Sequence, residues 1–166
     1  MIEEKKSFGT GDINLAAAMQ ALGIPPDPRK PIELVARDNG KDYSRFHLCE
    51  ESECGKFNPY ALSDAWARPG AFKATNPGHP FSSLMEFISS RPRGCDTEDD
   101  WIYHAAGFLG LPIDAVHKVY KGIGRTCKAS PESPASYVCA FIYNRNALVQ
   151  SSRKIAGRGD FSPRNP

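Results

Sequence analysis

Gly110 lies between two apolar helical patterns and constrains the fold of residues 101–125 more than any other residue. A short turn that joins two helices at a steep angle favours a residue that accepts a positive φ, and glycine does so without steric cost. A small residue is also needed where the two backbones approach closely, and Ala106 stands at that place. The segment therefore predicts a helical hairpin that bends at Gly110, with Leu109 and Leu111 as core anchors beside the turn.

The second helix of this hairpin has a predicted core face and a predicted solvent face. Val116 falls at a core position, and the spacing i, i+3, i+4 and i+7 places four polar residues outward: Asp114, His117, Lys118 and Lys121. In DNA-binding helix-turn-helix proteins this face enters the major groove. Helical hairpins with a glycine C-cap also occur in proteins that bind no nucleic acid, so both interpretations stay open.

Charge is distributed unevenly along the chain. Residues 1–100 carry 12 Lys+Arg against 16 Asp+Glu, whereas residues 101–166 carry 9 against 3. Because basic segments gather at phosphates by releasing counterions, the C-terminal half is predicted to bind DNA or RNA, with Arg125 and Arg145 beside the two lysines. Asp114 opposes phosphate binding unless it accepts a hydrogen bond from a cytosine amino group. The alternative is that the cations near the C-terminus only keep a tail solvated.

Composition predicts a globular cytoplasmic protein. The chain has 166 residues, 40% of them hydrophobic, and it contains no apolar run long enough to cross a membrane. Its five cysteines show no repeated spacing, which argues against a disulfide framework. His47, Cys49 and Cys54 cluster, but without a Cys-x-x-Cys pair we expect neither a metal site nor a cofactor.

The first fifty residues predict a β-α-β-β unit with a short antiparallel sheet. Residues 5–11 suit a strand, and Thr10 or Asp12 can cap a helix that Gly23 ends. Residues 32–49 suit a hairpin. A two-residue Asn-Gly loop would mix polar and apolar side chains on one face, whereas a three-residue loop over 38–40 pairs Ile32 with Phe46, so we expect the latter.

The start of this unit resembles a family of small uncharacterised bacterial and phage domains. The resemblance rests on an aromatic-x-Thr-x-Asp-x-x-Leu-Ala-Ala pattern, which the chain carries as Phe8, Thr10, Asp12, Leu15, Ala16 and Ala17, with Gly23 after it. It covers about 45 residues and implies the β-α-β-β arrangement, but no catalytic residue. The proline-rich connector and the long helical remainder depart from that short pattern.

Helical patterns dominate the rest of the chain, so the predicted fold class is α+β with a mainly helical C-terminal half. Helices are expected near 58–67 and 80–90, with a loop over 71–79, and a final helix begins at Ser133 or Pro134. The breaker segment 91–94 suggests a division into an acidic half over 1–92 and a basic helical half over 93–155, followed by a disordered tail over 156–166.

Motifs for nucleotide binding and for serine hydrolases are missing from the sequence, so we expect a protein that is not an enzyme. Two other interpretations remain. Trp101, Phe108 and the final helix could form a protein-docking or homodimer surface, or a cleft around His79 and His104 could be catalytic. Gly122 is expected to end a helix or to belong to a phosphate-binding nest over 122–125.

Overall fold

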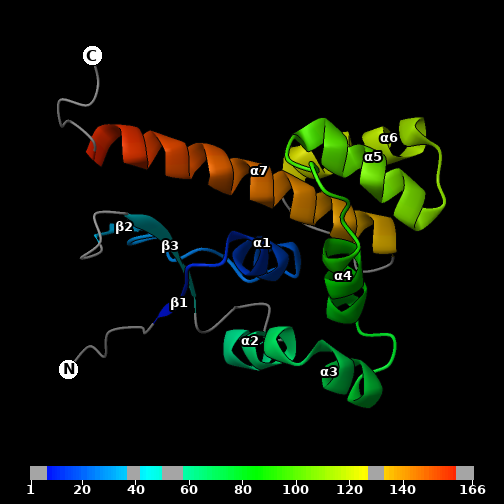
Figure 1. Cartoon of the computed structure of the whole chain (residues 1–166), viewed down its shortest axis with the longest axis horizontal. Helices are drawn as coiled ribbons and strands as arrows, with labels where there is room; N and C mark the ends of the chain where they lie inside the picture. Colours follow the sequence, from blue (N-terminus) through cyan, green and yellow to red (C-terminus); the bar gives the residue numbers. More distant parts are fainter. Residues whose placement is uncertain (1–6, 37–41, 50–57, 127–132, 160–166) are drawn as a thin grey trace.

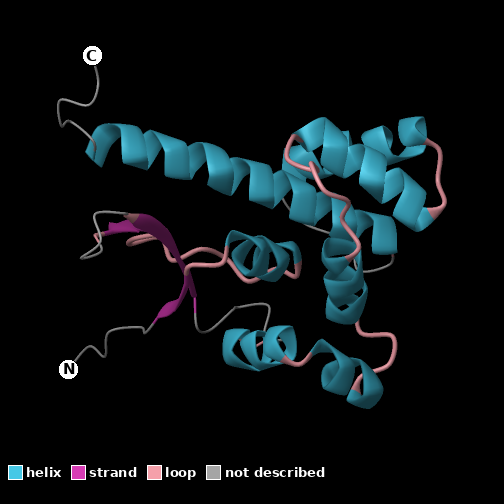
Figure 2. Ribbon diagram, in the orientation of Figure 1, coloured by secondary structure: helices cyan, strands magenta, loops and turns pink. Residues whose placement is uncertain are grey.

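The computed structural model describes residues 7–36, 42–49, 58–126 and 133–159; for 124–126 and 156–159 it describes the helical backbone only. A short sheet lies at one end and helices make up the remainder, so the predicted α+β class is confirmed (Figure 1, Figure 2). In chain order the elements are β1 (Ser7–Thr10), α1 (Ile13–Ala21), β2 (Ile32–Val35), β3 (Tyr43–Cys49), α2 (Pro59–Ala67), α3 (Pro69–Thr75), α4 (Pro80–Ser89), α5 (Glu98–Leu109), α6 (Ile113–Thr126) and α7 (Pro134–Gly159).

The sheet is antiparallel with β3 in the centre, in the order β1-β3-β2. Ile32 pairs with Phe46, as the three-residue loop predicts, although residues 37–41 of that loop lie outside the described part of the chain. This register puts Phe46 and Leu48 on the buried face of the sheet, because side chains alternate between faces along a strand. The opposite face carries polar side chains from all three strands.

The proline-rich connector extends the sheet edge beside β2. The backbone N–H of Asp27 donates to the carbonyl of His47, and the N–H of Cys49 donates to the carbonyl of Pro25. The N–H of His47 donates to the carbonyl of Pro31 in turn. Proline lacks an N–H but keeps its carbonyl, so the carbonyl groups of this segment can still accept hydrogen bonds from the N–H groups of β3.

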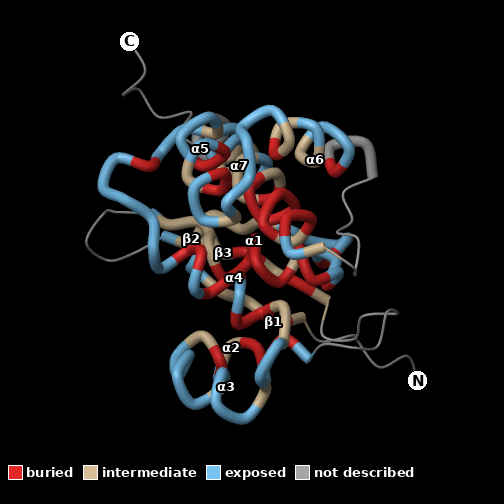
Figure 3. The backbone as a smooth tube through the Cα atoms, turned by 90° about the vertical axis from the view of Figure 1, so that its right-hand side faces the viewer, coloured by how far each residue is buried: buried red, intermediate tan, exposed pale blue. Residues whose placement is uncertain are grey.

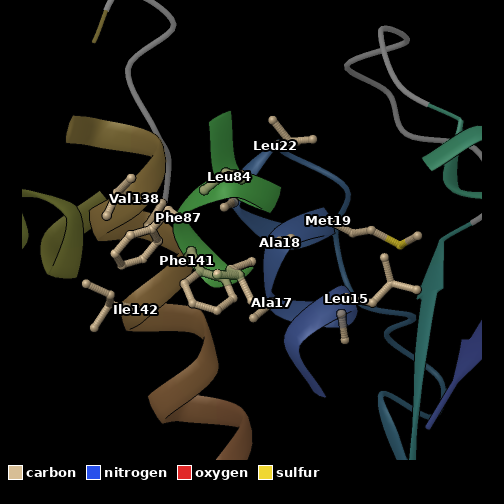
Figure 4. Close-up of a cluster of buried hydrophobic side chains, with 14 of the residues drawn as sticks. Leu15, Ala17, Ala18, Met19, Leu22, Leu84, Phe87, Val138, Phe141 and Ile142 are labelled. Atoms are coloured by element: carbon tan, nitrogen blue, oxygen red, sulfur yellow. The ribbon is translucent and has the colours of Figure 1, made fainter. Parts of the chain in front are cut away.

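Helix α1 lies between the sheet and α7, and its side chains fill the centre of the core. Asp12 caps it by accepting hydrogen bonds from the N–H groups of Asn14 and Leu15. Ala16, Ala17 and Ala18 are fully buried, and such small side chains let two helices pack at short interaxial distance. Figure 4 shows Ala17 of α1 near Phe141 of α7, with the Met19 side chain extending from the other side of α1 toward the sheet.

Helix α3 occupies residues 71–75 of the segment that was expected to be a loop, and only residues 76–79 form a loop before α4. Residues 71–79 were predicted as a loop because Pro69 and Gly70 normally stop a helix, but Pro69 instead occupies the first turn of α3. A first-turn proline is tolerated because its missing N–H has no intrahelical acceptor. The Phe72 ring packs edge-on against Phe81 and against His79, which holds this short helix on α4.

Helix α7 packs against much of the fold. It contacts α1, α4, α5, α6 and β2, and Figure 1 shows it running along one side of the molecule from the helical end to the sheet. Buried positions are frequent along α7 and α1, whereas α3 is mostly exposed (Figure 3). The acidic and basic segments thus share one hydrophobic cluster. The helix continues to Gly159, and residues 160–166 of the predicted tail lie outside the described part of the chain.

Over the residues that the structure describes, none of the helices combines the length and the apolarity that a membrane crossing requires.

The burial of Ala106 in α5 gives a test of helix packing. Ala106→Leu should overfill the core around the α5–α6 turn and lower the free energy of unfolding by roughly 1–3 kcal/mol, because Ala106 is only 6% exposed. Urea denaturation measures this change. The matched control is Gly107→Ala at the next position, where an added Cβ has no atom within 4 Å. That variant should gain roughly 0.5–1 kcal/mol by helix propensity. An Ala106→Leu protein as stable as the parent would mean that the site has spare room.

Candidate functional site

The turn between α5 and α6 is built as the sequence predicts. Gly110 ends α5 in the left-handed conformation, with φ 66° and ψ 32°. The N–H of Leu111 donates to the carbonyl of Ala106 at 3.0 Å, and the N–H of Gly110 donates to the carbonyl of Gly107 at 3.4 Å. This pair of bonds is the Schellman motif, which satisfies two carbonyls that the helix end leaves free. The prediction of a bend at Gly110 is therefore confirmed.

The start of α5 is fixed by a reciprocal cap. The Asp100 N–H donates to the Thr97 hydroxyl, and the Thr97 N–H donates to the Asp100 carboxylate, both at 3.1 Å. These hydrogen bonds hold the pKa of Asp100 below its usual value. Acidic side chains in the first turn also interact favourably with the helix dipole. The acidic residues at 98–100 thus have a structural role in positioning the hairpin.

One face of α6 is buried against α7 and α5. Val116 is fully buried, and Ile123 is 5% exposed. The thiol of Cys139 on α7 donates to the carbonyl of Val116 at 3.8 Å, and burial raises the pKa of that thiol to about 12, so it stays protonated. Burial and the nearby Glu98 raise the pKa of the Tyr120 phenol. These contacts fix the rotation of α6 about its axis and so decide which side chains reach solvent.

The opposite face of α6 carries most of the residues predicted for nucleic-acid binding. Asp114, Lys118 and Lys121 are exposed, in agreement with their helical spacing, and His117 is half-buried at the edge of this face. The backbone of Arg125 lies in α6, but its side chain is outside the described part of the chain. We call the exposed side chains of Lys118 and Lys121 the lysine face.

Arg145 was predicted to join the lysine face, but its contacts are elsewhere. Its guanidinium lies 5.1 Å from the centroid of the Trp101 ring, and its Nε donates to the side-chain oxygen of Asn14 at 3.0 Å. Burial lowers the pKa of Arg145. Arginine nevertheless stays protonated in proteins, so the charge is used inside the fold to join α1, α5 and α7.

Apolar side chains are exposed around the same turn. Leu111 was expected as a core anchor, yet it is 39% exposed, because the chain leaves α5 at Gly110 and carries Leu111 outward. Tyr103 on α5 is 70% exposed. Phe108 and Ile113 are each 37% exposed, although Phe108 also contacts the Phe87 ring. We call these four residues the apolar turn surface: Tyr103, Phe108, Leu111 and Ile113.

The expectation for Gly122 was wrong. It lies inside α6, which continues to Thr126, and it is not among the glycines with positive φ. A phosphate-binding nest requires a change of backbone hand, and a continuous helix provides none. The helix continues because buried Ile123 fastens this part of α6 to the core.

The histidines proposed for a catalytic cleft are used in packing and capping. His79 accepts a hydrogen bond from the N–H of Phe81 at 3.1 Å and so caps α4, and burial lowers its pKa. The His104 ring stacks on Phe87 at a centroid distance of 4.8 Å, and its Nε2 lies 3.1 Å from the Phe87 carbonyl. The two imidazoles thus contact opposite ends of α4.

His47, Cys49 and Cys54 are the possible metal ligands that the sequence groups together. Among the described residues, no group of three or more His, Cys, Asp or Glu is placed to hold a metal ion. Cys95 and Cys139 are free thiols, and Cys54 lies outside the described ranges.

Sequence reasoning missed a row of polar side chains across the outer face of the sheet. Ser7 on β1 and Glu33 on β2 both contact His47 on β3. The predicted hairpin register already places Glu33 opposite Arg45, one diagonal step from His47. Pairing of the first strand with β3 was the missing information, because no sequence signal fixed which strand would lie beside His47.

Two glycines of the hairpin should respond to alanine with opposite signs. Gly110→Ala should lower the free energy of unfolding by roughly 1–2 kcal/mol, because a Cβ is strained at positive φ. Gly122→Ala should raise it by roughly 0.5–1 kcal/mol, because the residue is exposed, helical and has open space around it. Thermal and urea denaturation measure both. Equal effects would show that Gly110 does not hold the left-handed conformation in solution.

Comparison with protein-family models, with curated proteins and with solved structures finds no match for this chain.

Proposed function

We propose that this protein binds nucleic acid through the lysine face of α6. The observation that carries the proposal is the exposure of Lys118 and Lys121 on the side of α6 opposite buried Val116. They are three residues apart, so their ammonium groups project from neighbouring positions of one helix face. Two adjacent cations on a rigid helix suit the phosphates of one backbone strand.

The residues around the lysine face favour contacts to the phosphate backbone of a nucleic acid over contacts to its bases. Asp114 lies in the first turn of α6, where the helix dipole favours an acid, and four residues before Lys118. This placement gives Asp114 a structural role and leaves the two lysines as the contacts. Because phosphate contacts carry no sequence information, the expected binding is weakly sequence-specific and strongly dependent on salt.

The other described cations of the C-terminal segment lie apart from α6. Arg145 packs on Trp101, and exposed Arg153 and Lys154 lie in the last third of α7, beside the sheet end of the molecule (Figure 1). The lysine face is thus a compact site of two charges. The distant pair provides a control with the same change in net charge.

Binding to a fluorescent DNA duplex tests this proposal. Lys118→Ala with Lys121→Ala should weaken binding roughly tenfold or more at low salt and reduce the slope of log affinity against log salt by up to about two. Arg153→Ala with Lys154→Ala removes the same charge and should leave both quantities nearly unchanged. Fluorescence anisotropy titrations over a salt series measure affinity and slope. Duplex RNA and single strands, tested alongside, identify the preferred form.

Two outcomes would contradict the proposal. Undetectable binding by the parent protein at low salt would remove nucleic acid as a partner. Equal weakening by the two double variants would show that total charge, and not the lysine face, determines binding.

A second candidate function is self-association through the apolar turn surface, as a homodimer or other interaction module. Tyr103 favours it, because an aromatic side chain that is 70% exposed leaves a large apolar area in water. Aromatic residues are enriched in protein interfaces. A symmetric dimer would use the same surface on both copies, so residues near the axis would face themselves. For either function a cytoplasmic location accords with the free thiols of Cys95 and Cys139.

Light scattering over a concentration series separates this candidate from the first. If the apolar turn surface is an interface, the parent protein should show a self-associated species and Tyr103→Glu should shift it to monomer. Tyr103→Phe keeps the ring and should retain the association. A parent protein that stays monomeric at all concentrations, without a co-purifying partner, would exclude the interaction module.

A further inference from the structure

A chain of polar contacts runs across the solvent-facing side of all three strands. Lys30 donates to Oε2 of Glu33 at 2.8 Å, and Oε1 of Glu33 lies 3.1 Å from Nε2 of His47. Nδ1 of His47 lies 3.4 Å from the hydroxyl oxygen of Ser7. A hydroxyl, an imidazole and a carboxylate therefore stand in the order that nucleophilic serine sites use, with the two ring nitrogens exchanged.

The direction of each hydrogen bond follows from Glu33. Hydrogen bonds from Lys30 and His47 hold the pKa of Glu33 below its usual value, so this side chain is an acceptor at neutral pH. Nε2 of His47 must then carry the proton and donate it. In the neutral imidazole this leaves Nδ1 with a lone pair directed at Ser7, so the serine O–H donates to it.

The strand register explains why these groups meet. Ser7 pairs with Cys49 and Gly9 pairs with His47, so Ser7 is diagonal to His47 across β1 and β3. Glu33 pairs with Arg45 and is diagonal to His47 across β2 and β3. Each side chain is anchored on a strand, and Lys30 holds the second oxygen of Glu33. The His47 side chain is 16% exposed and that of Glu33 is 32% exposed, so the row is shielded but remains in reach of a small reagent.

A cation lies beside this row. Arg45 projects from β3 on the same face as His47, and its Nη2 donates to the carbonyl of Gly9 at 3.3 Å. The guanidinium covers Gly9 so closely that a Cβ there would lie 2.6 Å from Nε. Glycine at this position therefore makes room for the guanidinium on the face of the sheet that carries Ser7 and His47, and a positive group there would favour an acyl oxygen that gains negative charge.

We infer that Ser7 is an activated nucleophile, with His47 as its base and Glu33 as the positioning residue, and that it accepts an acyl group from small esters. The Ser7 oxygen forms a bond to the acyl carbon while its proton passes to Nδ1 of His47. The bond from the acyl carbon to the leaving oxygen breaks, and the alcohol leaves with the proton from His47. Water then adds to the acyl-serine by the same route in reverse, which releases the acid and restores Ser7.

This inference is independent of nucleic-acid binding, because it involves the sheet and not α6. The probe is p-nitrophenyl acetate, which should transfer one acetyl group to Ser7 and release p-nitrophenol. Mass spectrometry of the intact chain and of its peptides locates the acetyl group. Cys49 stands directly opposite Ser7 and is the competing nucleophile, so its peptide is mapped in the same experiment.

Three variants test the roles. Ser7→Ala should abolish acetylation of that peptide, whereas Ser83→Ala, an exposed serine on α4, should not alter it. His47→Gln should slow acetylation of Ser7 roughly 100-fold, a usual contribution of a general base. Glu33→Gln should slow it, because a neutral amide can also donate to Nε2 and so no longer fixes the tautomer in which Nδ1 accepts from Ser7. Glu33→Asp keeps the acceptor and should restore part of the rate, which a merely structural role for Glu33 would not predict.

Circular dichroism melting identifies any variant that fails to fold. If a variant does not fold, the site of acetylation in the parent protein decides. Acetylation of Ser7 in preference to Cys49 and to an exposed serine such as Ser83 supports the inference. Three results would overturn it: no acetylation of Ser7 in the parent protein, acetylation of Cys49 instead, or a folded His47→Gln variant that reacts at the parent rate.

Discussion

The fold depends on apolar contact between α7 and the elements around it. Phe141 and Ile142 of α7 are fully buried among side chains of α1, α4 and α5, and burial of each such side chain contributes roughly 1.5–3 kcal/mol. A part-buried hydrogen bond to a charged acceptor, such as that from Asn146 to Glu98, contributes roughly 1.5–3 kcal/mol, which matches one such side chain but not the sum of those that α7 buries. The packing of α7 therefore positions the other elements, and the polar contacts make smaller contributions to their arrangement.

The same packing determines what the surface can do. Because Val116 and Ile123 must face α7, the lysine face of α6 has to point to water. Arg145 shows the opposite case, since its position on α7 brings it against Trp101 and removes its charge from the surface. The position of a cation relative to α7 thus decides whether it can reach a phosphate or is used in contacts within the fold. The net charge of the chain does not distinguish these two kinds of cation.

Local rules account for most of the fold that was predicted correctly. The αL turn at Gly110, the Asp12 cap of α1 and the register of Ile32 with Phe46 each depend on residues close in sequence. The failures share a different cause. Residues 71–75 of the predicted loop form part of α3, because Phe72 has Phe81 to pack on, and Gly122 stays helical because Ile123 is buried. Contacts between distant residues overrode the local preference in both cases.

The sequence by itself determined the elements, their caps and the amphipathic faces, because these follow from backbone sterics and from helical and strand periodicity. Only the tertiary structure decided which groups meet. It placed Ser7 beside His47, 40 residues away, and Arg145 beside Asn14, 131 residues away. Such pairings depend on how strands order in a sheet and on which helix α7 contacts, and these are set by the summed burial of many side chains rather than by any local pattern.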